Sequence, residues 1–295
     1  MPPAPTAARL HEPLRTWFDA SARVLPWRGG GATGWRVLVS EVMLQQTPVA
    51  RVQLVFDTWV ARWPAPAALA ADSLGEAVRA WGRLGYPRRA LRLHRAAVAC
   101  VQQFGGAVPE AYEDLRSLPG VGDYTVVVVA SFAYGRRHAV LDTNVRRVLA
   151  RVAGGQARQP AGAARADERQ RAEELLPDDG DRCARWNAAV MELGALVCRA
   201  RTPRCGICPL AAHCRWRLAG APPWTGPVAP PQRYAGTDRQ ARGRLLAVLR
   251  EADGPVDDPA LAGAWADQGQ RERALAGLVA DGLVVPAAPD RWRLP

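Results

Sequence analysis

Four cysteines lie close together in the spacing C-x6-C-x2-C-x5-C: Cys198, Cys205, Cys208 and Cys214. Four thiolates at such spacing can hold a tetrahedral zinc ion or an iron–sulfur cluster. Zinc ribbons usually pair two C-x2-C knuckles, whereas this segment has one, and its wide first gap suits a loop around a larger cube. The spacing therefore favours a [4Fe–4S] cluster over zinc. The remaining cysteines, Cys100 and Cys183, are expected in the core.

A second segment, Leu118 to Thr125, reads L-P-G-V-G-D-Y-T. Glycines such as Gly120 and Gly122 let the backbone turn tightly, so that amide groups at the start of the next helix can face a phosphate. The segment has the form of a helix-hairpin-helix, although an ordinary glycine turn between helices would share P-G-V-G.

The charge balance points to a polyanionic partner. The net charge is +11 and the isoelectric point about 10.3, a balance that supplies affinity for phosphates but that a merely basic protein would share. Arg199, Arg201 and Arg204 lie between the first two cysteines of the loop, where they are suited to grip phosphates. The chain contains no lysine, which excludes chemistry through a lysine Schiff base.

Together with these features, three further segments resemble the A/G-specific adenine DNA glycosylases (MutY type) of the helix-hairpin-helix, iron–sulfur superfamily. They are residues 35–47 (WRVLVSEVMLQQT), 85–86 (GY) and 141–148 (LDTNVRRV), and the resemblance covers about residues 14–218. It implies a base-excision repair enzyme that removes adenine mispaired with guanine or 8-oxoguanine from double-stranded DNA. The SEVMLQQT part is the most specific, because related endonuclease III enzymes share the hairpin, the aspartate and the cluster but not this part.

Two carboxylates are candidates for the chemistry. Cleaving an N-glycosidic bond leaves a cation-like sugar and a poor leaving group, so the base needs a proton and the sugar needs a facing negative charge. Glu41 lies among apolar residues, where loss of water would raise its pKa and keep it a usable acid; a helix-surface glutamate is the alternative. Asp142 precedes a predicted helix, either only as its cap or also as an ionised group facing the cation. The resemblance assigns cation stabilisation to Asp142 and water positioning to Asn144.

Tyr124 decides the subclass within this resemblance. In glycosylase/lyases the matching hairpin position carries the lysine that attacks the sugar, and here that position is tyrosine in a chain without lysine. We therefore expect a monofunctional glycosylase that leaves an abasic site. A half-buried helix aromatic is the other interpretation of Tyr124, whereas the family places it near the flipped base.

Adenine in a duplex must be rotated out of its stack before it can react. The resemblance assigns wedge roles to Gln46 and Tyr86, and it places Trp27, Arg28 and Glu192 around the adenine. Tyr86 and Trp27 as core aromatics, and Glu192 as a surface charge, are the competing interpretations.

Helical spacing of apolar residues dominates from Leu14 to about Leu218, so we expect a mainly α protein with the two-lobed fold of the helix-hairpin-helix glycosylases. One lobe is predicted from residues 1–30 and 141–220 with the cluster loop, and a helical barrel lobe with the hairpin over 31–140. A proline-rich linker over 221–236 leads to a winged-helix-like module over 237–295. Helix caps are predicted at Ser73, at Thr237 and at Thr47, the last with Pro48 as the first helical residue.

Within that module, helices are predicted at 239–251, 259–266 and 270–281, followed by a two-stranded wing within 283–294. The module is too short for the MutT-like domain that reads oxidised guanine in many family members. Recognition of oxidised guanine is then weaker, made by this module in another way, or made by the catalytic domain alone. These three possibilities stay open.

The longest apolar run is far shorter than the roughly 20 residues that span a bilayer, and no secretory signal is visible at the N-terminus. We expect a cytoplasmic, nucleoid-associated monomer with no membrane partner, in which cysteines are metal ligands or free thiols. Two other functions remain to be distinguished: a glycosylase for another mismatched base, such as thymine in T:G, and a non-catalytic iron–sulfur DNA-binding protein.

Overall fold

The computed structural model describes residues 3–29, 31–226 and 233–295, and its regular structure is mainly helical, as predicted. The first helices are α1 (Ala7–Ser21), α2 (Gly34–Leu44), α3 (Val49–Arg62), α4 (Pro66–Ala70), α5 (Leu74–Trp81), α6 (Arg88–Gln103), α7 (Tyr112–Ser117) and α8 (Asp123–Tyr134). They are followed by α9 (Thr143–Val152), α10 (Ala166–Glu174), α11 (Gly180–Leu196), the 3-10 turns η1 (Cys205–Ile207) and η2 (Ala211–His213), and α12 (Arg215–Leu218). The last elements are α13 (Asp238–Glu251), β1 (Val256–Asp257), α14 (Asp258–Ala264), α15 (Gln268–Ala280), β2 (Val285–Ala288) and β3 (Arg291–Arg293).

The chain divides into two compact units. The first unit comprises Met1–Val37, Glu110–Arg116 and Val121–Val228, and the second comprises Leu38–Pro109, Ser117–Gly120 and Ala229–Pro295. The lobe and linker boundaries given above stay a prediction, and part of the linker, residues 227–232, lies outside the described residues. Within the described residues, no helix has the length and apolar character needed to cross a membrane.

The core of the first unit joins α1, α9 and α11 to the cysteine loop. Leu14 from α1, Val148 from α9 and Leu193 from α11 are fully buried in it, and Trp216 of α12 closes it beside the cysteines. Burial of one such large apolar side chain stabilises the fold by about 1.5–3 kcal/mol. The cysteine loop and α9 share this core, so the same packing holds both in place.

The core of the second unit is built around aromatic side chains. Phe56 and Trp59 on α3 are buried, and the Trp59 ring lies 4.5 Å from the Trp63 ring and 5.5 Å from the Trp81 ring, in edge-on arrangements that aromatic pairs favour. Together with Val52 and Val60, Phe56 and Trp59 form the buried face of α3.

The three predicted helix caps differ in outcome. Ser73 accepts a hydrogen bond from the N–H of Glu76, and Thr237 accepts one from the N–H of Gln240, which confirms both caps. The third was wrong by one residue, because α3 begins at Val49 and Pro48 is its N-cap. The hydroxyl of Thr47 is used elsewhere: it donates to the carbonyl of Leu84.

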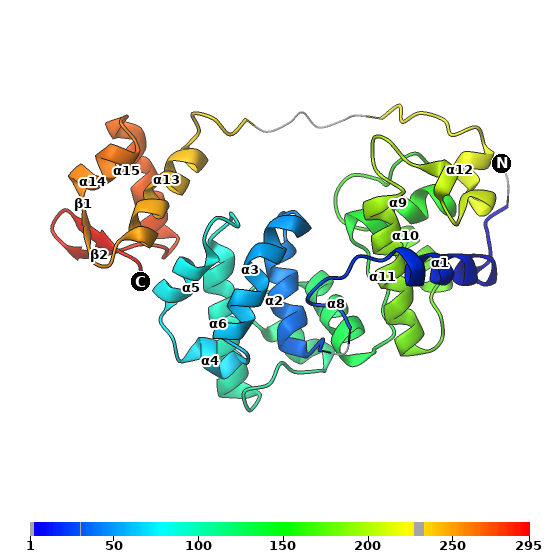
Figure 1. Ribbon diagram of the computed structural model, residues 1–295, viewed down its shortest axis with the longest axis horizontal. Helices are drawn as coiled ribbons and strands as arrows, with labels where there is room; N and C mark the ends of the chain where they lie inside the picture. Colours follow the sequence, from blue (N-terminus) through cyan, green and yellow to red (C-terminus); the bar gives the residue numbers. More distant parts are fainter. Residues whose placement is uncertain (1–2, 30, 227–232) are drawn as a thin grey trace. The chain divides into compact units, whose positions relative to one another are not determined.

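The C-terminal residues form the predicted three helices, α13 to α15, with a wing (orange and red in Figure 1). Its antiparallel sheet has three strands in the order β1-β3-β2, with Val256 opposite Trp292 and Val285 opposite Arg293. The prediction had two strands. It missed β1 because a strand of two residues has no periodicity and exists only through its pairing with β3.

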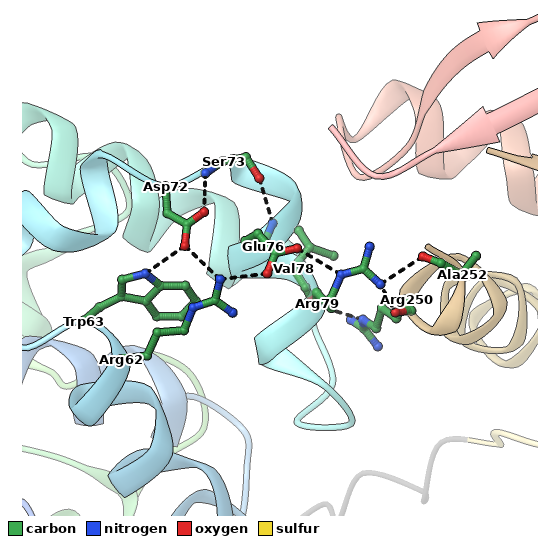
Figure 2. A network of polar contacts seen from close by, with 9 residues as sticks. All are labelled: Arg62, Trp63, Asp72, Ser73, Glu76, Val78, Arg79, Arg250 and Ala252. Atoms are coloured by element: carbon green, nitrogen blue, oxygen red, sulfur yellow. Dashed lines mark hydrogen bonds and ion pairs between the residues drawn. The ribbon is translucent and has the colours of Figure 1, made fainter. Parts of the chain in front are cut away.

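Reciprocal arginine contacts join α13 to α5 (Figure 2). Arg79 donates to the carbonyls of Arg250 and Ala252, and so satisfies groups that the C-terminal end of α13 leaves without helical partners. Arg250 donates in return to the carbonyl of Val78 at 3.0 Å. Burial lowers the pKa of the Arg250 guanidinium to about 10. Glu76 pairs with Arg79 within α5 and with Arg62 of α3, so the second ion pair connects α5 to α3.

Leu294 and Pro295 pack against Gly75 on α5. This contact predicts that adding a methyl group at Gly75 changes the stability in opposite directions when the two residues are present and when they are removed. A Cβ on Gly75 would lie 2.5 Å from the carbonyl oxygen of Pro295 and 3.2 Å from the Cβ of Leu294. Alanine within a helix is otherwise more stabilising than glycine by roughly 0.5–1 kcal/mol. Gly75→Ala should therefore lower the midpoint of urea unfolding in the full chain and raise it in a chain that lacks Leu294 and Pro295. An increase in both chains would contradict the docked arrangement.

Candidate active site and cluster loop

Asp142 is the N-cap of α9. Its side chain accepts a 2.6 Å hydrogen bond from the N–H of Val145 and a 2.9 Å hydrogen bond from Nδ2 of Asn144. Burial raises the pKa of the Asp142 carboxyl above its ordinary value of 3.8, and the hydrogen bonds from Val145 and Asn144 act in the opposite direction. We expected the amides of the helix start to favour the ionised form, and they do, but burial has the larger effect.

Arg147 connects this aspartate to the cysteine loop. Its guanidinium donates to Oδ1 of Asn144 and to the carbonyls of Gly194 and Cys198, each at 2.7 Å. Gly194 permits the close approach of α11 to α9, because a Cβ there would lie only 2.6 Å from the Cβ of Asn144. The Asp142 carboxylate is therefore linked, through two side chains, to the backbone of the first cysteine.

The four cysteines line one cavity at the edge of the first unit's core, together with Arg151 and Trp216. Arg151 donates to the carbonyls of Arg199 and Ala200 at 2.9 and 3.0 Å, and its guanidinium lies over the Trp216 ring. Burial raises the pKa of the Cys208 thiol to about 11, so its thiolate needs a compensating positive charge such as bound iron.

The cysteine side chains suit a group that fills their shared cavity. Among the described residues, no three Cys, His, Asp or Glu side chains converge as the ligands of one ion would, whereas all four cysteines do line the same cavity. The neighbouring Arg199, Arg201 and Arg204 are all exposed. Cys100 and Cys183 are fully buried core residues, as expected.

Trp27, Arg28 and Glu192 lie together in the first unit. Glu192 is completely buried, and its carboxylate pairs with Arg23 at 2.6 Å and with Arg28 at 2.9 Å. Burial alone would raise the pKa of Glu192, but the two guanidinium groups outweigh it and lower that pKa. Nη1 of Arg28 is buried with no hydrogen-bond partner among the described residues, and Trp27 is buried.

The predicted hairpin is confirmed as the turn between α7 and α8. Gly120 has a φ of +81°, and a Cβ there would lie 2.8 Å from the Cβ of Arg92, so the position requires glycine. Gly122 is the N-cap of α8 with an ordinary φ of −103°, and a Cβ there would meet nothing within 4 Å. Gly122 and the first two residues of α8 are exposed, and amides at an exposed helix start can face an anion. Tyr124 is the second residue of α8 and is 37% exposed.

Glu41, Gln46 and Tyr86 belong to the second unit. Glu41 is on α2 and only 8% exposed, between the buried side chains of Ser40 and Val42. Gln46 and Tyr86 are exposed residues of two turns, which follow α2 and precede α6. The structure thus brings together Asp142 with Asn144, and Trp27, Arg28 and Glu192, each set within the first unit.

Two family models match the chain. The HhH-GPD superfamily base excision DNA repair protein matches residues 39–174, and the iron–sulfur binding domain of endonuclease III matches residues 198–214. The second match spans the segment with the four cysteines and confirms the predicted iron–sulfur cofactor.

The chain is 50% identical over 283 residues to the adenine DNA glycosylase of Mycolicibacterium smegmatis, an alignment that covers 95% of this chain and 94% of that protein. The chain belongs to the adenine DNA glycosylases. The Mycobacterium tuberculosis H37Rv protein of that name is also 50% identical, over 96% of this chain and 92% of its own length. The thymine/uracil-DNA glycosylase of Pyrobaculum aerophilum is 32% identical over 69% of this chain and 89% of its own length.

Solved structures support the fold of this adenine DNA glycosylase family member. A thermostable thymine-DNA glycosylase matches with a TM-score of 0.66 and 25% identity, over 72% of this chain and 97% of that one. An endonuclease III–DNA complex matches with a TM-score of 0.60 and 22% identity, over 73% of this chain and 98% of that one. The predicted family and fold class are confirmed.

The sequence did not lead us to predict a role for three buried or partly buried arginines of this adenine DNA glycosylase family member: Arg23, Arg89 and Arg147. Arg89 interrupts an apolar stripe of α6 that continues through Leu93 and Ala96, and such an interruption is a readable signal of a buried charge. Arg23 precedes its partner Glu192 by 169 residues, and no local sequence pattern predicts a contact over that separation.

The raised pKa of Asp142 predicts how stability depends on pH. Because folding raises this pKa, ionisation of Asp142 opposes folding at neutral pH, and the opposition disappears as the pH falls through the raised pKa towards 3.8. The free energy of unfolding of the wild type, relative to Asp142→Asn, should therefore decrease from pH 4 to pH 7 in urea titrations. Asp142→Asn also loses the hydrogen bond that Asn144 donates, and it does so at every pH. This loss shifts the difference in unfolding free energy by a constant, so the slope of that difference with pH reports the charge of Asp142.

A flat difference for Asp142→Asn over this pH range would contradict the role of burial.

Proposed function

We propose that this chain hydrolyses the N-glycosidic bond of adenine mispaired with guanine or 8-oxoguanine in double-stranded DNA and leaves an abasic site. One observation carries the proposal: 50% identity to relatives named adenine DNA glycosylase over nearly the whole of both chains. The chain would act as a cytoplasmic, nucleoid-associated monomer.

The two carboxylates divide the chemistry. The burial of Glu41 supports its role as the acid that protonates the adenine leaving group, since loss of water favours a protonated carboxyl. Asp142 stabilises the cation-like sugar, and the hydrogen bond between Asp142 and Asn144 supports a role for Asn144 in placing the attacking water nearby.

The pocket around Arg28 supports recognition of a flipped base. A buried N–H without a protein partner is costly, and a ring nitrogen of the flipped adenine would accept a hydrogen bond from it. Glu192 orients Arg28 through their ion pair, while the buried Trp27 supplies an aromatic surface for stacking. The wedge roles of Gln46 and Tyr86 belong to the same proposal, as does the placement of Tyr124 near the base.

DNA backbone binding is assigned to the start of α8, behind Gly120 and Gly122, and to the exposed Arg199, Arg201 and Arg204. Cys198, Cys205, Cys208 and Cys214 would hold the [4Fe–4S] cluster, and its bonds to the four thiolates would cross-link the loop. The loop's own residues hold these arginines outward.

A second candidate substrate is thymine or uracil. It is favoured by the likeness to the Pyrobaculum aerophilum enzyme and to the solved thymine-DNA glycosylase. Both candidates need the same carboxylates, so the pocket residues alone would separate them.

The substrate prediction is tested by single-turnover excision on duplexes with adenine opposite guanine, 8-oxoguanine, cytosine or thymine, and with thymine opposite guanine. Adenine opposite guanine and 8-oxoguanine should be released fastest. Preferential release of thymine would establish the second candidate in place of the first.

Glu41→Gln should slow adenine release by about 10²–10⁴-fold, the usual contribution of general acid catalysis. Glu168→Gln is the matched control, because Glu168 is equally buried at 7% but pairs with Arg146 on α9. If both variants retain wild-type rates per folded molecule, Glu41 is not the acid.

The absence of lysine from the sequence predicts an enzyme without lyase activity. Borohydride reduction during turnover should trap at most traces of enzyme–DNA adduct, measured beside a lysine-containing glycosylase/lyase as a positive control. Adduct in comparable yield would show that another amine attacks the sugar.

A further inference from the structure

The turn after α2 and the turn before α6, both in the second unit, hold non-glycine residues in the left-handed region. Gln46 has a φ of 56° and Tyr86 a φ of 47°. This conformation costs an L-residue about 1–2 kcal/mol, so something in the surroundings must hold it. Tyr86 is also 46% exposed, which leaves a large aromatic ring at the surface without the burial that usually stabilises one.

Arg89, which is buried on α6, binds both turns at once. On the side of Gln46, its guanidinium donates to the carbonyls of Val42 and Met43 at 2.8 Å and to that of Gln45 at 2.5 Å. On the side of Tyr86, it donates to the carbonyl of Gly85 at 2.9 Å. Gln45 and Gly85 immediately precede the two left-handed residues.

Thr47 adds a second connection between the same turns. Its hydroxyl accepts from Arg89 at 2.8 Å and donates to the carbonyl of Leu84 at 3.1 Å. The Arg89 guanidinium also lies 5.5 Å from the Tyr86 ring centroid and 5.2 Å from that of Trp81, within reach of cation–π attraction.

The partners of Arg89 are oxygen dipoles at the end of a helix. The carbonyls of Val42 and Met43 belong to the last turn of α2, where helix carbonyls lack partners and the helix dipole favours a cation. Burial lowers the pKa of the guanidinium to about 10, which still leaves it charged at neutral pH. A lysine at this position would have too few donors for the five oxygens named above.

We infer that Arg89 is a positioning residue that holds the turns of Gln46 and Tyr86 in their left-handed form, so that both side chains enter a DNA duplex already ordered. The inference rests on the proposed function, in which both side chains contact the base stack around a flipped adenine. Preordering matters because a mobile loop loses conformational entropy when it binds.

The experiment compares Arg89→Lys with Arg250→Lys in the full chain. Arg250 is the matched control, because it lies in the same unit, its pKa is also lowered to about 10 by burial, and it donates to a backbone carbonyl away from both turns. The first measurement is hydrogen–deuterium exchange without DNA. Arg89→Lys should speed exchange of amides 45–47 and 85–86 by about tenfold or more, and Arg250→Lys by less than about twofold.

The second measurement is the fluorescence rise of 2-aminopurine placed as the target base opposite guanine, which follows its unstacking. Arg89→Lys should slow this rise by about tenfold, while Arg250→Lys stays within about twofold of the wild type. Thr47→Val, which keeps Arg89 but removes one partner, should show the same two changes at smaller size, and it serves if Arg89→Lys does not fold.

The outcomes separate the inference from the proposed function. Wild-type exchange and unstacking in Arg89→Lys, or in Thr47→Val if only that variant folds, would overturn the inference. So would equal losses in Arg250→Lys, because they would reflect general destabilisation. If the wild type neither unstacks 2-aminopurine nor releases adenine, the proposed function fails. The exchange measurement still tests whether Arg89 orders the turns of Gln46 and Tyr86.

Discussion

A guanidinium group carries five N–H donors in one plane, so a single buried arginine can satisfy carbonyls from several chain segments at once. Arg89 does this for two turns of the second unit, and Arg147 and Arg151 do it for α9 and the cysteine loop. Helix ends and tight turns leave such carbonyls without partners, which would otherwise be costly to bury. The turns of Gln46 and Tyr86, helix α9 and the cysteine loop are therefore each held by an arginine that binds several backbone oxygens.

Burying a charge with dipoles as partners has a cost, and it is visible in the pKa of Arg89 and of Arg250, both lowered to about 10. Arginine tolerates this because its ordinary pKa leaves a wide margin above neutrality, whereas a buried lysine often loses its proton. A chain whose basic residues are all arginine can use buried cations as cross-links at several places. Its composition thus contributes to its architecture as well as to its surface charge.

Local chemistry made much of the molecule readable from the sequence. The caps at Ser73 and Thr237 follow from neighbours within a few positions, and the cavity lined by the four cysteines follows from their spacing. The wrong predictions concern features that depend on residues distant in the sequence. Pro48 became the cap of α3 because the hydroxyl of Thr47 binds groups about forty residues away, and β1 is defined by a partner strand rather than by its own residues.

Asp142 shows why a functional residue can oppose the local preference. A capping aspartate ordinarily gains from helix N–H groups, yet here burial outweighs them and makes the negative charge costly. Under the proposed function that cost has a use, because an anion held in poor solvation interacts more strongly with a positive charge developing beside it. The hydrogen bonds from Val145 and Asn144 fix its position without solvating it as fully as water would. Substitutions that solvate Asp142 better would then stabilise the fold while weakening its attraction for the cation.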